Sequence, residues 1–271
     1  MNYVKLIFDL KTPDDGDILA AFLSSMNVQG FEEYDRSLFV FFNEEEYNEA
    51  EVKELVAPMS YTFQTEIIPH ENWNSQWESN FQPIRISNEV GVRADFHPPF
   101  TDCKYDIIIT PKMSFGTGHH ETTQMMLEFE SETPFENKSV LDFGCGTGLL
   151  AIFARLKGGN HVIGIDNDEW SMENAKENCL RNQCQDIVIS PQDLQTIDGK
   201  FDFVLANINL NVLLESFGKM KELLDSGGQI FLSGILLSDI PAISKCFTDL
   251  GFELIAQKQK KDWVALHVKL A

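Results

Sequence analysis

The sequence predicts an α/β protein in which a small α+β domain precedes a larger domain built on a doubly wound, mostly parallel sheet. Three observations carry this prediction. From Ser139 onward, short apolar runs alternate with amphipathic helical segments, as in parallel sheets that are covered on both faces. The first of these runs leads into a glycine-rich turn. Residues 1–70 instead show strand and helix patterns in the order βαββαβ. The length of 271 residues is sufficient for two such domains.

The composition is that of a strongly acidic globular protein. The 42 Asp and Glu residues outnumber the 21 Lys and Arg residues, which gives a net charge of −21. This balance argues against phosphate-rich partners and anionic membranes, although acidity can also serve solubility alone. No apolar run approaches the roughly 18 residues of a membrane span, and the N-terminus has no signal-peptide pattern. We therefore expect a cytoplasmic protein, and we expect a monomer.

The five cysteines are odd in number and are never spaced as CxxC. This pattern suggests neither a disulfide framework nor a zinc site, so reduced thiols are expected.

The first seventy residues predict a ferredoxin-like domain, a fold that hosts many functions. This segment has four basic and fourteen acidic residues, so its net charge of −10 is almost half that of the chain. Strands are expected at 4–10, 30–35, 37–42 and 61–69, and helices at 17–26 and 44–59.

Residues 71–110 are expected to connect the two domains. Trp73, Trp77 and Phe81 recur every four residues and so would share one face of a short helix, which Pro83 ends. Packing of these aromatic rings against a domain is favoured over a role in stacking on a ligand. Short strand-like pieces follow up to residue 110.

Residues 111–271 form the predicted larger domain. Its helix at 210–228 is expected to stop at Gly227 and Gly228. The last two strands are expected to add a terminal hairpin to the parallel sheet. The other expected helices are at 149–159, 169–182 and 239–251, and the strands are at 139–144, 161–166, 186–190, 201–208, 228–235, 252–259 and 263–270.

The turn after the first strand of the larger domain has the form D-x-G-x-G-x-G, from Asp142 to Gly148. Glycines let the backbone turn tightly and approach a ligand, and the following helix offers free N–H groups. Position 149 is Leu, so the G-x-G-x-x-G pattern of dinucleotide binding is not met, and no Gly-Lys-Ser/Thr completes a P-loop. The remaining form is associated with S-adenosylmethionine, although a glycine turn without ligand stays possible.

Polar residues end two further strands of the predicted sheet. Asp166 follows the glycines by about twenty residues, where a carboxylate can accept hydrogen bonds from both hydroxyls of a ribose. Asp168 is better explained as a helix cap. Asn207 ends the fourth strand, at the edge where open α/β sheets bind ligands. Amine methyltransferases often have Asn-Pro-Pro-Tyr there, whereas this chain has Asn207-Ile208-Asn209-Leu210.

The most distinctive run is MSFGTGHHETT, at residues 113–123. Its glycines predict a flexible loop that leads into a helix, and such a loop can serve as a lid over a cofactor. A zinc site is the competing interpretation, but Gln124 stands where the second His of H-E-x-x-H would be. We therefore expect no metal.

These motifs, FGTGHHETT, LDFGCGTGLLAI, IGID and LANI in this order, resemble the ribosomal protein L11 methyltransferase family of the PrmA type. The resemblance runs from about Lys112 to the end, and the W-x-x-x-W-x-x-x-F-x-P-I run of the connector is also similar. It implies a class I methyltransferase (Rossmann-like) domain, a ferredoxin-like substrate-recognition domain and S-adenosylmethionine as cofactor. It also implies methylation of ribosomal protein L11 on lysine side chains, on the α-amino group or on both, with no direct nucleic-acid specificity.

Carried over residue by residue, the resemblance implies that Asn207 faces the methyl group and orients the incoming amine, with no general base assigned. Glu121 stands where a Pro is usual in the family, which leaves the details of lid closure open. The residues implied to bind the cofactor are Gly116, Thr117, Thr123, Asp142, Gly144, Gly146, Asp166 and Asn207.

Two other functions remain open from the sequence. An RNA or small-molecule N-methyltransferase could use the same fold, and basic clusters near the site would favour RNA. The chain offers only scattered lysines for this purpose, such as Lys258, Lys260 and Lys261. A module that binds the cofactor without turnover is the third possibility, although Asn207 would then have no role.

Overall fold

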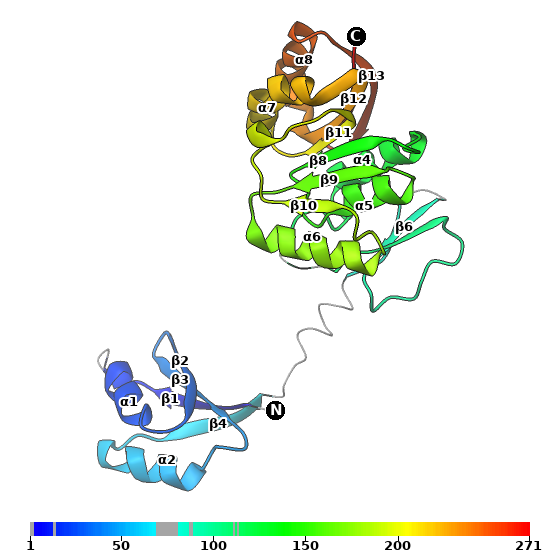
Figure 1. Ribbon diagram of the computed structural model, residues 1–271. Coiled ribbons are helices and arrows are strands. Elements are labelled where there is room, and N and C mark those ends of the chain that lie inside the picture. The colour runs from blue at the N-terminus through cyan, green and yellow to red at the C-terminus, as the bar shows by residue number, and fades with distance from the viewer. Residues whose placement is uncertain (1–2, 13–14, 69–80, 87–88, 111, 113) are drawn as a thin grey trace. The chain divides into compact units, whose positions relative to one another are not determined.

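The computed structural model describes residues 3–12, 15–68, 81–86, 89–110, 112 and 114–271 (Figure 1). The chain divides into two compact units, Met1–Trp77 and Glu78–Ala271. Trp73 and Trp77 of the predicted connecting helix lie outside the described residues. Within the described residues, no helix is long and apolar enough to cross a membrane.

The smaller unit has the predicted order βαββαβ. Its described part forms a four-stranded antiparallel sheet in the order β2-β3-β1-β4. Alternate residues of β1 and β3, such as Leu6 and Val40, are fully buried, and helix residues such as Leu19 and Val52 join the same core. The elements are β1 (Tyr3–Asp9), α1 (Asp15–Leu23), β2 (Val28–Tyr34), β3 (Ser37–Asn43), α2 (Glu49–Val56), a short 3₁₀ turn (Ala57–Met59) and β4 (Phe63–Ile68).

The larger unit begins with a small sheet and continues with the alternating strands and helices that the sequence predicts. Figure 1 shows both parts. The small sheet contains β5 (Ile84–Arg85), β6 (Val90–Arg93) and β7 (Tyr105–Ile108). The helices that follow are α4 (Glu121–Glu132), α5 (Leu149–Leu156), α6 (Glu169–Arg181), α7 (Leu210–Leu223) and α8 (Ile240–Asp249). The strands are β8 (Ser139–Phe143), β9 (His161–Ile165), β10 (Val188–Ser190), β11 (Phe201–Asn207), β12 (Leu224–Leu236), β13 (Phe252–Lys260) and β14 (Trp263–Leu270).

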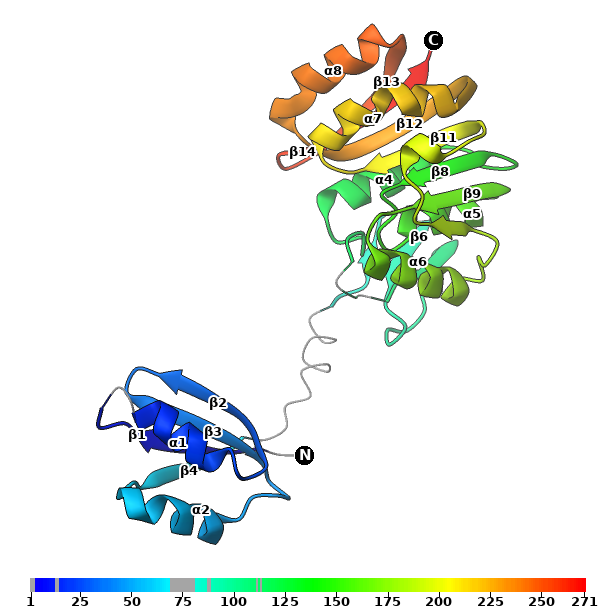
Figure 2. The ribbon, with the colours of Figure 1, turned by 60° about the vertical axis from the view of Figure 1, so that its left-hand side comes forward.

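In the described residues these strands form one seven-stranded sheet, in the order β10-β9-β8-β11-β12-β14-β13. The pairs from β10 to β12 are parallel, and β14 pairs antiparallel with both β12 and β13. The predicted doubly wound sheet with a terminal hairpin is therefore confirmed. Helices α4 and α5 share one core with the sheet, and α7 and α8 share another, so the two cores lie on opposite faces (Figure 2).

Two boundaries differ from those expected from the sequence. Helix α7 ends at Leu223 and not at the glycine pair, because Leu224 already pairs with Phe201 of β11 and so starts β12. The described end of the predicted connector also packs with the larger unit. Val90 of β6 and Ile107 of β7 are fully buried in the core that contains α4 and α5.

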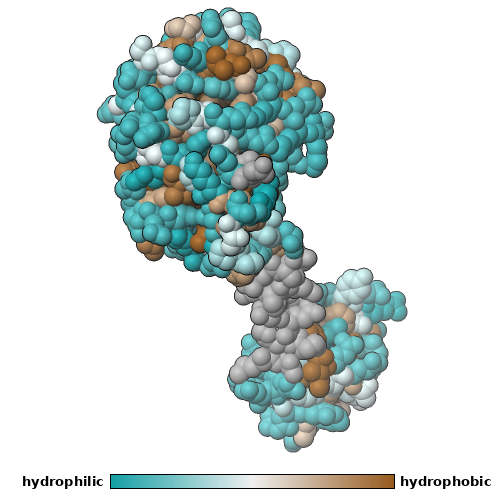
Figure 3. Space-filling view, turned by 90° about the vertical axis from the view of Figure 1, so that its right-hand side faces the viewer, coloured by the Kyte–Doolittle hydropathy of each residue, from teal (hydrophilic) through white to brown (hydrophobic). Residues whose placement is uncertain are grey.

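The strand order of the sheet reverses at β8. Strand β8 pairs with β9 on one side and with β11 on the other. The chain runs from β8 outward to β9 and β10 and then crosses to β11 on the other side of β8. Open α/β sheets bind ligands in the crevice at such a reversal of strand order. Elsewhere the view in Figure 3 shows mainly hydrophilic residues on this unit, with hydrophobic residues in separate groups.

Candidate active site

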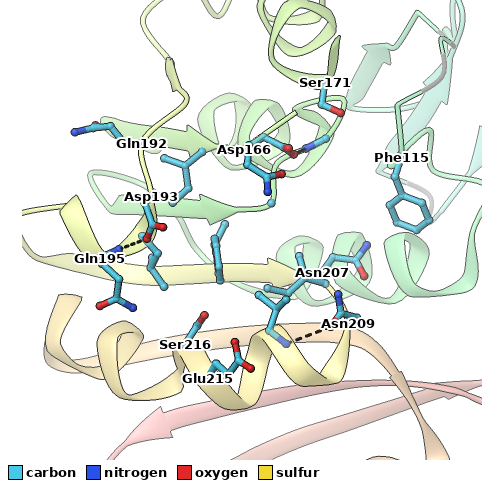
Figure 4. Close-up of a pocket in the computed structure, with 18 residues that line it drawn as sticks. Phe115, Asp166, Ser171, Gln192, Asp193, Gln195, Asn207, Asn209, Glu215 and Ser216 are labelled. Carbon is cyan, nitrogen blue, oxygen red and sulfur yellow. Dashed lines mark hydrogen bonds between the residues drawn. The ribbon is translucent and has the colours of Figure 1, made fainter. Parts of the chain in front are cut away.

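A cavity of about 640 Å³ lies at the carboxyl ends of β8, β9, β10 and β11. Figure 4 shows Asp193 and Gln195 at one end and Phe115 with Asn207 at the other. The volume is in the range typical of small-molecule sites. The lining residues are Phe115, Phe143, Gly144, Gly146, Ile165, Asp166, Asn167, Ser171, Gln192, Asp193, Leu194, Gln195, Asn207, Ile208, Asn209, Val212, Glu215 and Ser216.

The charge of this cavity indicates the kind of ligand that it suits. Asp166, Asp193 and Glu215 contribute carboxylates, and the described lining residues include no Lys, Arg or His. A pyrophosphate would meet like charge without a cationic partner, whereas a cationic ligand would be attracted. The cavity therefore favours a ligand that is rich in hydrogen-bond donors and carries positive charge.

The glycine-rich turn lines the cavity at the end of β8. Gly144 and Gly146 both have positive φ, at 75° and 52°, and residues other than glycine rarely adopt such backbone angles. A Cβ at Gly144 would lie 2.5 Å from Cγ2 of Ile208, and one at Gly146 would overlap the carbonyl oxygen of Phe115. Glycine is thus required both by the turn and by the close approach of neighbouring segments.

Asp166 connects this turn to the next helix. Its Oδ2 accepts a hydrogen bond from the Gly146 N–H at 2.9 Å, and its Oδ1 accepts one from the Asp168 N–H at 3.0 Å. Each carboxylate oxygen has a further lone pair for a ribose hydroxyl. Asp168 accepts from the Ser171 N–H at the start of α6, so its predicted role as a helix cap is confirmed.

Asn207 presents an acceptor that has no partner. Its Nδ2 donates to Oγ1 of Thr123 at 3.3 Å, while its Oδ1 is buried and accepts no hydrogen bond from any residue that the structure describes. The backbone beyond it is fixed by the neighbouring strand, because the Ile208 N–H donates to the Ser233 carbonyl at 3.2 Å. A buried, unpartnered acceptor is costly in a fold, and such an oxygen is available to a ligand that donates.

The distinctive loop is attached to the glycine turn. The Thr147 N–H donates to the Phe115 carbonyl at 3.0 Å, and the Thr147 hydroxyl donates to the Gly116 carbonyl at 2.6 Å. Phe115 itself is 54% exposed and lines the cavity. The predicted flexible lid thus has two anchoring hydrogen bonds in this structure, and its exposed aromatic ring stands at the mouth of the cavity.

Asp142 lies behind the turn and not in the cavity. It is 1% exposed, and its Oδ2 accepts from the Ala151 N–H at 3.1 Å, which ties β8 to the start of α5. Burial raises the pKa of Asp142 to about 7, and the charge of Asp166 adds to this effect. Burial also raises the pKa of Glu130 on α4 well above its ordinary value. Neither carboxyl group has a counter-charge in direct contact among the described residues.

The predicted site residues fall into four groups. Gly144, Gly146, Asp166 and Asn207 come together around the main cavity. Gly116 and Thr123 line a small neighbouring space with Asn207, and Thr117 lines a shallow depression outside the loop. Asp142 is only indirectly connected to the site.

Sequence reasoning missed the lining residues beyond β10. Asp193 lies three residues after the end of that strand, and its Oδ1 accepts from the Gln195 N–H at 2.8 Å. The rule that ligands bind at the carboxyl ends of parallel strands would have found it. Glu215 on α7 carried no signal in the sequence, because only the packing of that helix brings it to the cavity.

The described residues contain no cluster of His, Cys, Asp and Glu that could hold a metal ion. The lysines considered for RNA are engaged within the larger unit. Lys258 pairs with Glu132 at 2.6 Å, Lys260 pairs with Glu128 at 2.8 Å, and Lys261 pairs with Glu121. These pairs attach β13 and its turn to α4.

Comparison with known proteins identifies a matching family. Residues 18–271 match the family described as ribosomal protein L11 methyltransferase (PrmA). The chain is 36% identical over 281 residues to the ribosomal protein L11 methyltransferase of Porphyromonas gingivalis, covering 98% of this chain and 97% of that one. A similar protein from Bacteroides fragilis is 36% identical over 278 residues, with 98% and 99% coverage.

A crystal structure of a ribosomal protein L11 methylase from Lactobacillus delbrueckii subsp. bulgaricus is similar to the larger part of this chain. Its TM-score is 0.65 at 29% identity, covering 69% of this chain and 98% of that one.

Proposed function

Since the chain belongs to the ribosomal protein L11 methyltransferase family, we propose that it transfers methyl groups from S-adenosylmethionine to amines of ribosomal protein L11. The acceptor amines are lysine side chains, the α-amino group or both. The observation that carries the amine specificity is the buried, unpartnered Oδ1 of Asn207 at the edge of the cavity. A neutral amine carries N–H groups that can donate to this oxygen.

S-Adenosylmethionine fits the residues that surround the cavity. When bound, it supplies a methyl group on a positively charged sulfur, and its ammonium group, ribose hydroxyls and adenine amine are all donors. Asp166 would hold the ribose, and Asp193 would accept from the adenine. Gly144 and Gly146 leave the space that side chains would fill. The acidic lining also complements the positive charge of the cofactor.

Amine methylation needs a neutral nitrogen with its lone pair aimed at the methyl carbon, so positioning supplies much of the rate. A lysine with a pKa near 10.4 costs about 4.6 kcal/mol to deprotonate at pH 7, and an α-amine near 7.8 costs about 1.1 kcal/mol. Asn207 would orient the amine through Oδ1. Desolvation and the nearby sulfonium charge would lower the pKa of the amine, and no general base is assigned.

Substrate recognition is assigned to the acidic first domain. Residues 1–70 would form a ferredoxin-like recognition domain, 71–110 a connector and 111–271 the methyltransferase domain. The net charge of −10 on the first domain suits a basic ribosomal protein. We propose that the protein acts as a monomer without direct nucleic-acid specificity.

The test uses the full chain with S-adenosylmethionine labelled in its methyl group and purified ribosomal protein L11. We expect label on lysine or N-terminal amines, located by mass spectrometry. In a parallel reaction with ribosomal RNA we expect none, because the lysines near α4 are already paired with carboxylates. Label that enters RNA and not protein would overturn the proposal.

Asn207→Ala tests the assigned role of the amide and also the idea of a binding module without turnover. We expect kcat to fall about 100-fold, because a misplaced nucleophile costs roughly that much. Asn209→Ala is the matched control. Its Oδ1 caps α7 by accepting from the Val212 N–H, so its loss should affect stability more than kcat. Equal turnover by Asn207→Ala and the wild type would remove the assigned role.

A further inference from the structure

Thr123 lies where it can control the direction in which the Asn207 amide points. It belongs to the first turn of α4, whereas Asn207 ends β11, 84 residues further along the chain. The side chain of Thr123 is 1% exposed, and its hydroxyl oxygen lies 3.3 Å from Nδ2 of Asn207. The resemblance to known methyltransferases suggested instead that this threonine contacts the cofactor.

An asparagine amide has two ends of nearly equal size but opposite polarity. One end donates two N–H groups and the other accepts. Only the oxygen end can accept from a substrate amine, whereas an N–H donor turned toward the amine would compete for the lone pair that attacks the methyl carbon. The function of Asn207 therefore depends on a partner that holds its nitrogen end away from the substrate.

We propose that Thr123 is this partner, a positioning residue that fixes the Asn207 amide with Oδ1 presented to the substrate amine. The inference rests on the proposed function, since it assumes an amine acceptor. Two observations carry it. The nitrogen end already donates to Thr123, and the oxygen end is buried without a partner. The shared lining of a small space by Thr123, Gly144 and Asn207 places this contact directly beside the glycine turn.

The contact is held by packing that is independent of the cofactor. Helix α4 packs against β11, β12 and β14, and its residues Met125, Met126 and Phe129 are buried in the adjoining core. The N-terminus of the helix is fixed by His120, whose ring accepts from the Thr122 N–H. Thr123 therefore occupies a rigid element, which is what a positioning residue requires.

The experiment compares Thr123→Val, which keeps the shape but removes the hydroxyl, with Thr123→Ser, which keeps the hydroxyl. With the full chain and ribosomal protein L11, we expect Thr123→Val to lower kcat about 10- to 100-fold. The dissociation constant for S-adenosylmethionine, measured by calorimetry, should stay within about twofold of the wild-type value. Thr123→Ser should restore most of kcat.

Thr122→Val is the matched control. Thr122 is also buried in the first turn of α4, but its hydroxyl bonds to His120 at 2.7 Å and not to Asn207. Both Thr122→Val and Thr123→Val should lower the free energy of unfolding, but Thr122→Val should cause a smaller loss of kcat. A rise of tenfold or more in the dissociation constant for S-adenosylmethionine in Thr123→Val, with kcat unchanged, would overturn the inference and make Thr123 a cofactor contact. Equal losses in Thr123→Val and Thr123→Ser would also overturn it, because Thr123→Ser keeps the hydroxyl and the hydroxyl would then not be what sustains kcat.

Asn207→Ala separates this inference from the proposed function. If Asn207→Ala loses activity and Thr123→Val retains it, only the role of Thr123 is wrong. If Asn207→Ala retains full activity, the assignment of the amide to the amine is wrong as well.

Discussion

Glu130 and Asp142 are buried carboxyl groups without a counter-charge in direct contact. Both oxygens of Glu130 and Oδ1 of Asp142 have no hydrogen-bond partner in the described part of the chain. Isolated charges in a protein interior are strongly disfavoured, so such groups bind protons more tightly in the folded chain than in the unfolded one. Lys157 lies close enough to oppose the effect on Glu130, but its Nζ bonds to the Glu130 backbone carbonyl. The folded protein therefore keeps these protons up to a higher pH than the unfolded chain does.

This arrangement predicts how stability depends on pH. Burial raises the pKa of Asp142 to about 7 in the folded chain, whereas an ordinary aspartate has a pKa of 3.8. Because the folded state binds more protons between these values, the free energy of unfolding should fall as the pH rises from about 4 to about 7. Asp142→Asn removes this contribution. In urea denaturation, the free energy of unfolding of the wild type should fall between pH 5 and pH 8 by about 3 kcal/mol more than that of Asp142→Asn.

The informative quantity is the slope of stability against pH, since the new amide group of Asp142→Asn also changes the absolute stability. A variant whose stability declines over this range as steeply as that of the wild type would show that Asp142 does not carry the proton. Glu130→Gln should act in the same direction, because burial raises the pKa of that group too.

At the scale of elements, hydrogen bonds and close packing link the anchored loop to the glycine turn. Two hydrogen bonds from Thr147 hold the loop at Phe115 and Gly116. The backbone of Gly146 approaches the Phe115 carbonyl so closely that no Cβ fits between them. Displacement of either segment therefore displaces the other.

Gly146→Ala should separate the two segments. We expect the affinity for S-adenosylmethionine, measured by calorimetry, to fall at least tenfold, because the new methyl group overlaps the Phe115 carbonyl and a cost of only about 1.4 kcal/mol already corresponds to a tenfold loss. Gly218→Ala in α7 is the control, since a Cβ there has nothing within 4 Å. It should leave the affinity unchanged and stabilise the helix by roughly 0.5–1 kcal/mol. Unchanged affinity in Gly146→Ala would show that the loop can move away from the new methyl group without loss of binding free energy.

The terminal hairpin and α4 form another pair of linked elements. The pairs of Lys258, Lys260 and Lys261 with carboxylates of α4 place the hairpin against that helix. Surface ion pairs of this kind contribute little stability individually. Their consequence here is functional, because they leave these cations with partners inside the chain and so weaken the case for an RNA surface.

At the scale of the whole molecule, the charge is distributed unevenly. Residues 1–70 have a net charge of −10, residues 71–110 have −3, and residues 111–271 have −8. The density is highest on the domain that is proposed to meet a basic protein. Attraction between exposed charges is screened over about 8 Å at physiological ionic strength, so association should depend on salt.

We therefore expect kcat/KM for ribosomal protein L11 to fall about tenfold when the salt concentration is raised from about 50 mM to about 500 mM. The dissociation constant for S-adenosylmethionine should change much less and serves as the control, since that cofactor would lie within a cavity. An indifference of kcat/KM to ionic strength would mean that the acidity serves solubility and not recognition.

The amino-acid sequence by itself determined the fold class and predicted the position of the candidate site. Periodicity and apolar runs are local signals, so they predicted the βαββαβ order, the doubly wound sheet and the hairpin. The glycine spacing and the strand-end residues Asp166 and Asn207 predicted where a ligand would bind. The end of α7 was misplaced, because pairing of Leu224 with the distant Phe201 overrides the local signal of the glycines.

Only the tertiary structure decided which atoms of these residues line the cavity and which already have hydrogen-bond partners. It showed that Asp142 supports the turn from behind, that Asp193 and Glu215 line the cavity, and that the nitrogen end of Asn207 is occupied by Thr123. These facts depend on contacts between segments far apart in the chain. A side chain's burial and hydrogen-bond partners are set by such packing, which no local pattern of residues encodes.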